Sequence, residues 1–224
     1  MPTGKIHPLT VLDDHSRFAL LVAACAAEYA EIVAAHVLAR FDRYGLPRRI
    51  LTDNGPPWGT AGTPGLTALE ASWLRLGIVV SHGRPLHPQT QGKVERLPRT
   101  IWAEVRGIHD CPNLDIAQHR FEVWRHGYNH QRPHEALDYA VPASRYRPSP
   151  RPLPTVLPPL VYGLEDAVRK VQADGAISFG GQDYFISHGL HGQPVAVRRT
   201  SEEGRWTVWY GQRQVATLDL ERQH

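Results

Sequence analysis

The sequence predicts an α/β region followed by a small all-β region. Short apolar runs alternate with stretches of helical periodicity over residues 1–140. Short strand-like runs separated by glycine turns fill residues 161–224. Between them, residues 141–160 are rich in proline and predict a stiff, extended linker that marks a domain boundary.

Composition sets wide limits on function. A chain of 224 residues is long enough for one large domain or two small ones. Its net charge of +3, with 13 histidines, permits a nucleic-acid partner without demanding one. Cys25 and Cys111 lack metal-ligand spacing and are expected to be reduced packing residues of a cytoplasmic protein. We expect neither a secretory signal nor a membrane partner, because no long apolar run is present.

The first elements are a hairpin and a helix. Residues 8–13 and 18–22 are apolar runs joined by a polar corner, where Asp13 and Asp14 are interpreted as turn residues pairing with Arg17. Residues 28–44 show helical spacing that ends at Gly45.

Strands and helices then alternate. Residues 48–52 predict a strand and 66–76 a helix after a turn-rich loop, and a strand follows at 78–81. Two further helices are predicted, from Gln89 towards Val105 and from Asp115 to Tyr128. His130 and His134, beyond the last helix, are interpreted as structural rather than as metal ligands.

Two short motifs concentrate the chemistry. Leu51-Thr-Asp-Asn-Gly55 places Asp53 at a strand end, and His87-Pro-Gln-Thr-Gln-Gly-Lys-Val-Glu-Arg96 places Glu95 inside a helix. Two carboxylates from such positions could converge on a hard cation, since Mg²⁺ binds oxygen ligands and two ions can clamp a phosphoryl displacement. Taken singly, Asp53 is more typical of a turn and Glu95 of a helix start.

Together and in this order, the motifs resemble those of DDE-type transposases and retroviral integrases. Thr52-Asp-Asn-Gly55 matches the second catalytic acid of that family, and the motif ending at Glu95 matches the third. Tyr128-Asn-His-Gln-Arg-Pro-His-Glu-Ala-Leu137 resembles the segment after the catalytic helix in bacterial insertion-sequence transposases.

The resemblance implies a ribonuclease-H-like integrase core at residues 1–140 that cleaves and transfers DNA strands. Asp53 and Glu95 would be the catalytic and metal-binding residues, with Mg²⁺ or Mn²⁺ as cofactor. The implied partners are transposon ends and target DNA, bound by a homo-oligomer in the bacterial cytoplasm, at the nucleoid. The residues expected to contact DNA are Asn54, Gln91, Lys93, Arg96 and Arg99; on composition alone, a solvated basic face would explain the cations.

The sequence departs from the family pattern in two ways. No residue ahead of the first strand matches the first catalytic Asp, whose strand is the central one of the implied fold. Pro98 lies inside the Glu95 helix, where proline costs about 3 kcal/mol and favours a kink. We therefore expect an N-terminally truncated, inactive transposase; the alternative is a non-catalytic remnant that binds DNA or multimerises.

The C-terminal region, residues 161–224, predicts six short strands and a small β-barrel. It resembles the SH3-like C-terminal domain of such transposases. Four arginines are candidate DNA contacts or, equally, parts of a solvated surface: Arg198, Arg199, Arg205 and Arg213.

Overall fold

The computed structural model describes residues 6–60, 65–83, 88–108 and 110–220, with the backbone alone described for residues 88–95. The chain forms two compact units. The first combines Met1–Leu46 with Gly83–Pro152, and the second combines Pro47–His82 with Leu153–His224. Among the described residues, no helix is long and apolar enough to cross a membrane.

The first unit is built on an antiparallel hairpin of β1 (His7–Leu12) and β2 (Ala19–Cys25), as predicted. At its corner, Arg17 forms an ion pair with Asp14 at 2.8 Å. The backbone N–H of Ser16 donates to the Asp13 carboxylate at 2.8 Å. Both contacts confirm that these two acids are turn residues.

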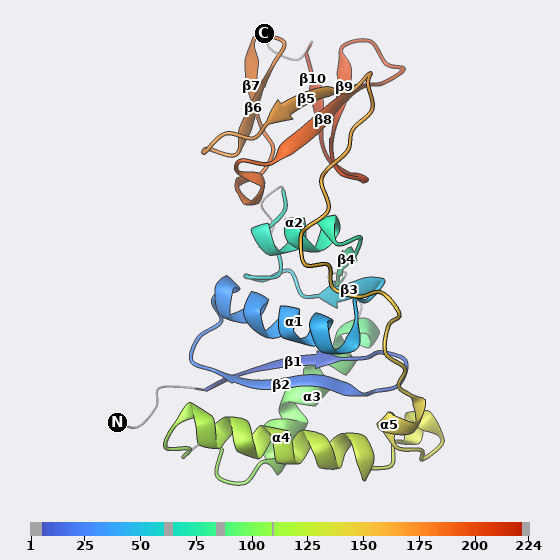
Figure 1. The fold of residues 1–224 in the computed structure, drawn as a ribbon. Helices are drawn as coiled ribbons and strands as arrows, with labels where there is room; N and C mark the ends of the chain where they lie inside the picture. The colour runs from blue at the N-terminus through green and yellow to red at the C-terminus, as the bar shows by residue number, and fades with distance from the viewer. Residues whose placement is uncertain (1–5, 61–64, 84–87, 109, 221–224) are drawn as a thin grey trace. The chain divides into compact units, whose positions relative to one another are not determined.

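Helix α1 (Ala30–Tyr44) lies on one face of this hairpin (Figure 1). Its buried side chains, Val33, Val37 and Phe41, follow at four-residue intervals and so share one face. The helix ends where predicted: Gly45 takes a φ of 78° and donates its N–H to the carbonyl of Phe41 at 2.8 Å.

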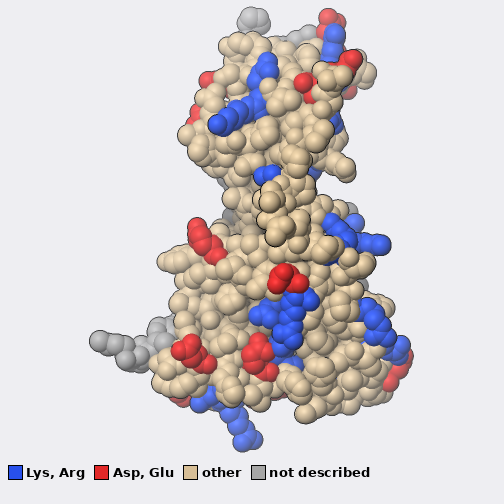
Figure 2. Space-filling model, in the orientation of Figure 1, with Lys and Arg blue, Asp and Glu red and all other residues tan. Residues whose placement is uncertain are grey.

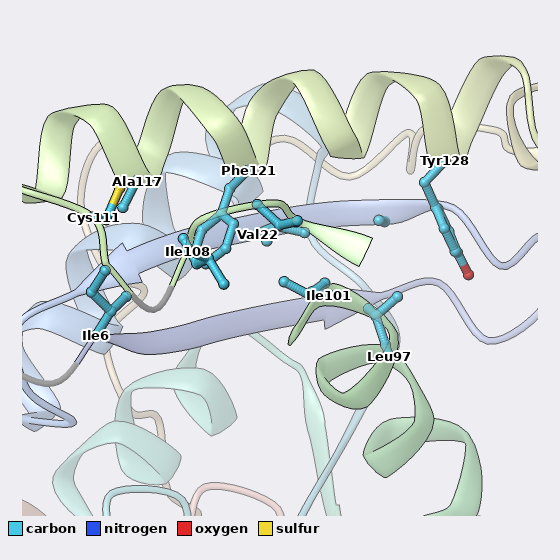
Figure 3. Packing of buried hydrophobic residues seen from close by; sticks show 11 residues of the cluster. Ile6, Val22, Leu97, Ile101, Ile108, Cys111, Ala117, Phe121 and Tyr128 are labelled. Atoms are coloured by element: carbon cyan, nitrogen blue, oxygen red, sulfur yellow. The ribbon is translucent and has the colours of Figure 1, made fainter. Parts of the chain in front are cut away.

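Helices α3 (Pro88–Glu104) and α4 (Leu114–His130) complete the first unit, with α4 on the opposite face of the hairpin from α1 (Figure 1). Side chains of β2, α3 and α4 meet in a single hydrophobic core (Figure 3). Val22, Ile101 and Phe121 are each fully buried in it. Successive side chains of β2 point to opposite faces of the hairpin. Val22 therefore lies in this core, whereas Leu21 and Ala23 lie in a second cluster that includes Ile32 of α1.

Two details of the first unit bear on the sequence predictions. Helix α3 continues through Pro98, although proline removes one backbone hydrogen bond of a helix. Leu97 and Ile101 of the same helix are buried in the core. Cys25 and Cys111 are buried free thiols, as predicted, and burial raises the pKa of Cys25.

The second unit begins with the parallel strands β3 (Arg49–Thr52) and β4 (Val79–His82), which are connected through α2 (Ala68–Arg75). Helix α2 starts two residues later than predicted because Thr67 is its N-cap. The Thr67 hydroxyl accepts from the N–H of Glu70 at 3.2 Å, and the Glu70 carboxylate accepts from the N–H of Thr67 at 2.7 Å.

All six strands predicted for the C-terminal region are present. A four-stranded antiparallel sheet has the order β10-β9-β8-β5, and β6 pairs with β7. The cluster beneath them buries side chains of the sheets together with Leu66 and Ala71 from the α2 segment. The strands are β5 (Ala167–Lys170), β6 (Ala176–Phe179), β7 (Gln182–Phe185), β8 (Pro194–Arg199), β9 (Arg205–Tyr210) and β10 (Arg213–Asp219).

The proline-rich stretch is not extended throughout. It opens with a helical turn, α5 (Pro142–Arg145), after the short 3₁₀ helix Glu135–Leu137. Pro142 is buried at the first position of that turn, where the missing N–H of proline costs nothing. The prediction that residues 141–160 are extended is therefore wrong at Pro142–Arg145, which form a helical turn.

The strands of the α/β region form two separate pairs. Within the described part of the chain, β1 pairs with β2 and β3 pairs with β4, and no strand hydrogen bonds to the second edge of β1 or of β3.

Candidate metal and nucleic-acid site

Asp53 follows directly after β3, where the sequence predicted it, and its side chain is exposed. Its Oδ1 accepts a hydrogen bond from the N–H of Gly55 at 3.0 Å, which closes an Asx turn. The turn interpretation of Asp53 is therefore correct. An exposed carboxylate oxygen is also the kind of ligand that Mg²⁺ binds.

His82, at the end of β4, contacts the backbone of Asp53. The parallel register pairs His82 with Thr52. Its Nδ1 lies 2.9 Å from the carbonyl oxygen of Asp53 and 3.0 Å from Oγ1 of Thr52. Because a carbonyl oxygen only accepts, Nδ1 is the donor in the hydrogen bond to Asp53.

The other ring nitrogen of His82 is held by Glu70. Nε2 lies 2.8 Å from Oε1 of Glu70, a residue that is only 1% exposed. The second carboxylate oxygen of Glu70 accepts from the Thr67 N–H in the helix cap. Nη1 of Arg213, from β10, is 4.0 Å from Oε1. A carboxylate oxygen only accepts, so Nε2 is the donor in its contact with Glu70. The buried carboxylate is thus compensated by a helix N-terminus, the Nε2–H of His82 and a guanidinium.

Sequence reasoning missed Glu70 and His82. Thr67-x-x-Glu70 is a capping-box pattern, so the sequence did contain a signal for Glu70 at the helix start. His82 has no local signal, since its contact with Asp53 depends on the pairing of β3 with β4.

The third acid motif is on a helix, as predicted. Glu95 lies within α3, and its side chain is outside the described part of the structure, as are those of Gln91 and Lys93. Arg96 and Arg99 are exposed on the same helix. Asn54 is exposed beside Asp53. Asp53 belongs to the second compact unit and α3 to the first.

Besides Arg213, which is paired with Glu70, two more of the C-terminal arginines form ion pairs within the chain. Arg198 makes two hydrogen bonds to Asp166, at 2.8 and 2.9 Å, and this contact lowers the pKa of Asp166. Arg205 pairs with Glu202 at 2.6 Å. On the face shown in Figure 2, basic and acidic side chains are interspersed. Their charges are therefore partly balanced before any partner binds.

Histidines near the end of α4 pack against aromatic rings. His134 lies edge-on to Tyr128, with ring centroids 4.7 Å apart, and His130 lies 4.7 Å from His126. No cluster of three or more His, Cys, Asp or Glu suited to a metal occurs among the residues that the structure describes. The ring contacts of His130 and His134 agree with their interpretation as structural residues.

Comparison with known families finds two matches. Residues 76–142 match the integrase core domain, a segment that contains all of α3. Residues 166–224 match the C-terminal domain of the IS481 family of transposases.

A curated relative and two solved structures agree with these matches. The insertion element IS407 uncharacterized 31.7 kDa protein of Burkholderia multivorans is 26% identical over 140 residues, which cover 62% of this chain and 48% of that protein. The catalytic core domain of BIV integrase has a TM-score of 0.50 at 24% identity, covering 65% of this chain and 88% of the other. A chain of the simian T-cell lymphotropic virus intasome in complex with PP2A regulatory subunit B56 gamma has a TM-score of 0.51 at 16% identity, covering 96% and 78%.

The fold resembles that of integrase cores, and the matches cover part of an integrase core domain and a transposase C-terminal domain. Over these segments the chain is similar to insertion-sequence transposases and retroviral integrases, so the resemblance drawn from the motifs is confirmed. The aligned region spans about half the length of the curated relative.

Proposed function

We propose that this chain is part of a bacterial insertion-sequence transposase that cleaves and joins DNA strands with divalent metal ions. One observation carries the proposal. The integrase-core match covers the helix of Glu95, and Asp53 stands in the preceding Thr-Asp-Asn-Gly turn at a strand end.

Asp53 and Glu95 are the residues proposed to hold Mg²⁺ or Mn²⁺. Their carboxylates are hard oxygen donors, and the exposed position of Asp53 leaves it accessible. When bound, such ions stabilise the attacking and leaving oxygens of a phosphodiester displacement. The protein side chains then have two tasks, to fix the ions and to orient the DNA backbone.

The domain organisation of the proposal follows the composition of the chain. Residues 1–140 form the catalytic core, 141–160 a proline-rich linker and 161–224 a small SH3-like barrel. Six short strands, their two antiparallel sheets and the match over residues 166–224 support the last assignment.

The proposed partners are transposon ends and target DNA, with the protein acting as a homo-oligomer on DNA in the cytoplasm, at the nucleoid. Cations and amides along α3 would contact phosphates, which fix register without reading sequence. The assigned residues are Asn54, Gln91, Lys93, Arg96 and Arg99.

The 224 residues alone are proposed to be inactive in strand transfer. Two of the family's three acids are assigned, and misplacement of catalytic groups by ~1 Å can cost ~10²-fold in rate. The test compares this chain with a version extended by an N-terminal strand bearing an Asp, using Mn²⁺ and a labelled transposon end. Nicking or joining is expected from the extended version alone. Turnover by the 224-residue chain that is abolished by Asp53→Asn would contradict the assignment of the first acid.

The second candidate is a non-catalytic remnant that binds DNA or co-assembles with an intact transposase. The match of residues 166–224 to a transposase C-terminal domain favours it, because that domain is present whatever the state of the acids. If the extended version is inactive but both forms bind the transposon end, this candidate replaces the first.

A further inference from the structure

We infer that His82 is a positioning residue that fixes the backbone of Asp53 and so aims its carboxylate. The inference rests on the metal-binding role proposed for Asp53. It assigns a task to a side chain that neither acid motif contains.

The geometry links Asp53 to a fixed point. Nδ1 of His82 donates to the Asp53 carbonyl at 2.9 Å, and Thr52 Oγ1 lies 3.0 Å from the same nitrogen. The side chain of Asp53 accepts from the N–H of Gly55 and closes the Asx turn. The ring of His82 therefore fixes the backbone at the first residue of that turn. With both ends of the turn held, the Asp53 carboxylate has little freedom to rotate away.

The imidazole is itself fixed from behind. Nε2 contacts Oε1 of Glu70, whose other oxygen accepts from the N–H of Thr67 at 2.7 Å. Glu70 lies in α2 and is 1% exposed, and Leu66 and Ala71 of that segment are packed in the core of the β sheets. A chain of three hydrogen bonds therefore connects the buried start of α2 to the backbone of Asp53.

A strand-end packing role would not require this geometry. For packing alone, one ring nitrogen could face solvent. Here both ring nitrogens have acceptors, and one acceptor is the carbonyl of the proposed metal ligand itself. Partners that orient metal ligands in this way typically affect metal affinity by ~10–100-fold when removed.

Two substitutions at His82 distinguish the roles of its two ring nitrogens, because each keeps one of the two hydrogen bonds. His82→Asn places an amide near the position of Nδ1 and keeps the donor to Asp53. His82→Gln places its amide near the position of Nε2 and keeps the contact with Glu70 while losing the donor. The readouts are Mn²⁺ binding, followed by electron paramagnetic resonance, and hydrogen exchange of the Asn54 and Gly55 amides. Urea midpoints of both variants control for folding.

His82→Gln is expected to weaken Mn²⁺ binding about tenfold, the lower end of the range for ligand-orienting partners, and to speed exchange at both amides. His82→Asn is expected to keep both properties within about twofold of the unmodified chain. Equal behaviour of the two variants, in either direction, would overturn the inference. Asp53→Asn distinguishes the metal-binding proposal from the positioning role of His82. If Asp53→Asn leaves Mn²⁺ binding unchanged, the metal-binding proposal fails. The exchange data then still decide whether His82 fixes the turn.

Discussion

The side chain of Asn129 on α4 hydrogen bonds to both backbone groups of Ala19 on β2. Oδ1 accepts from the N–H at 2.8 Å, Nδ2 donates to the carbonyl at 3.0 Å, and both residues are fully buried. The carbonyl of Ala19 has a second donor, Arg125, at 3.3 Å. Asn129 therefore takes the place of a neighbouring strand at this point of β2.

Asn129→Leu is expected to lower the free energy of unfolding by about 2–3 kcal/mol, because it leaves the Ala19 N–H buried without an acceptor. Urea unfolding measures the loss. Gln118→Leu is the matched control, since Gln118 makes the same kind of bond to the N–H of Ala24 at a half-buried position. A loss at Asn129 no larger than that at Gln118 would contradict this account of the strand edge.

Gly45 is expected to tolerate no side chain. A Cβ there would collide with the backbone oxygens of Ser149 and Arg151, in addition to the strain of its φ of 78°. Gly45→Ala should cost more than the ~1–3 kcal/mol of backbone strain alone. Gly181→Ala tests the backbone strain by itself, because Gly181 has a φ of 82° and no atom lies within 4 Å of the place that a Cβ would take. Similar losses for the two variants would show that the segment near Ser149 gives way easily.

Stability should fall with acidity partly through His134. Burial, followed by the charge of Arg132, lowers its pKa below the ordinary 6.5. A histidine with a lowered folded-state pKa stabilises the fold above its unfolded pKa, and that stability is lost as pH falls through the folded value. The unfolding free energy of His134→Phe should therefore change less than that of the unmodified chain between pH 7 and about pH 5. Identical pH dependences would contradict the lowered pKa.

DNA binding should depend on salt through α3. Replacing Lys93, Arg96 and Arg99 with glutamine is expected to weaken binding to all sequences alike. The slope of log affinity against log salt should fall by ~2.7, which is ~0.9 for each phosphate contact. Arg205→Gln is the control, because Arg205 is paired with Glu202. If the triple variant keeps the full slope, the cations of α3 form only a solvated surface.

The sequence predicted the elements well where local chemistry decides them. A polar corner predicted the hairpin of β1 and β2, and Gly45 predicted the end of α1. The predicted start of α2 was wrong by two residues, because the apolar spacing of the helix begins at Leu66. The capping-box pattern at Thr67 was a signal in the sequence for the correct start. The prediction at Pro142 was wrong for a similar reason. Proline is common both in extended segments and in the first turn of a helix, so a run of prolines does not distinguish the two.

Contacts between distant segments could not be predicted in the same way. The contact of His82 with Asp53 follows from the register of β3 and β4, and that of Glu70 with Arg213 joins residues from α2 and β10. The burial of Leu66 against the C-terminal strands likewise depends on tertiary packing. The pairing of Asp53 with Glu95 stays a prediction, and it rests on the family resemblance because the periodicity of the sequence gives no such pairing.

We propose that Asp53 and Glu95 hold the same divalent ions, and iron-directed cleavage of the protein backbone measures whether they do. Fe²⁺ replaces Mg²⁺ at oxygen-ligand sites and, with ascorbate and peroxide, cuts the protein backbone near the bound metal. We expect cuts close to both Asp53 and Glu95, and we expect excess Mg²⁺ and Asp53→Asn each to suppress both sets of cuts. Cuts confined to one segment, or cuts near Glu95 that persist in Asp53→Asn, would contradict this proposal.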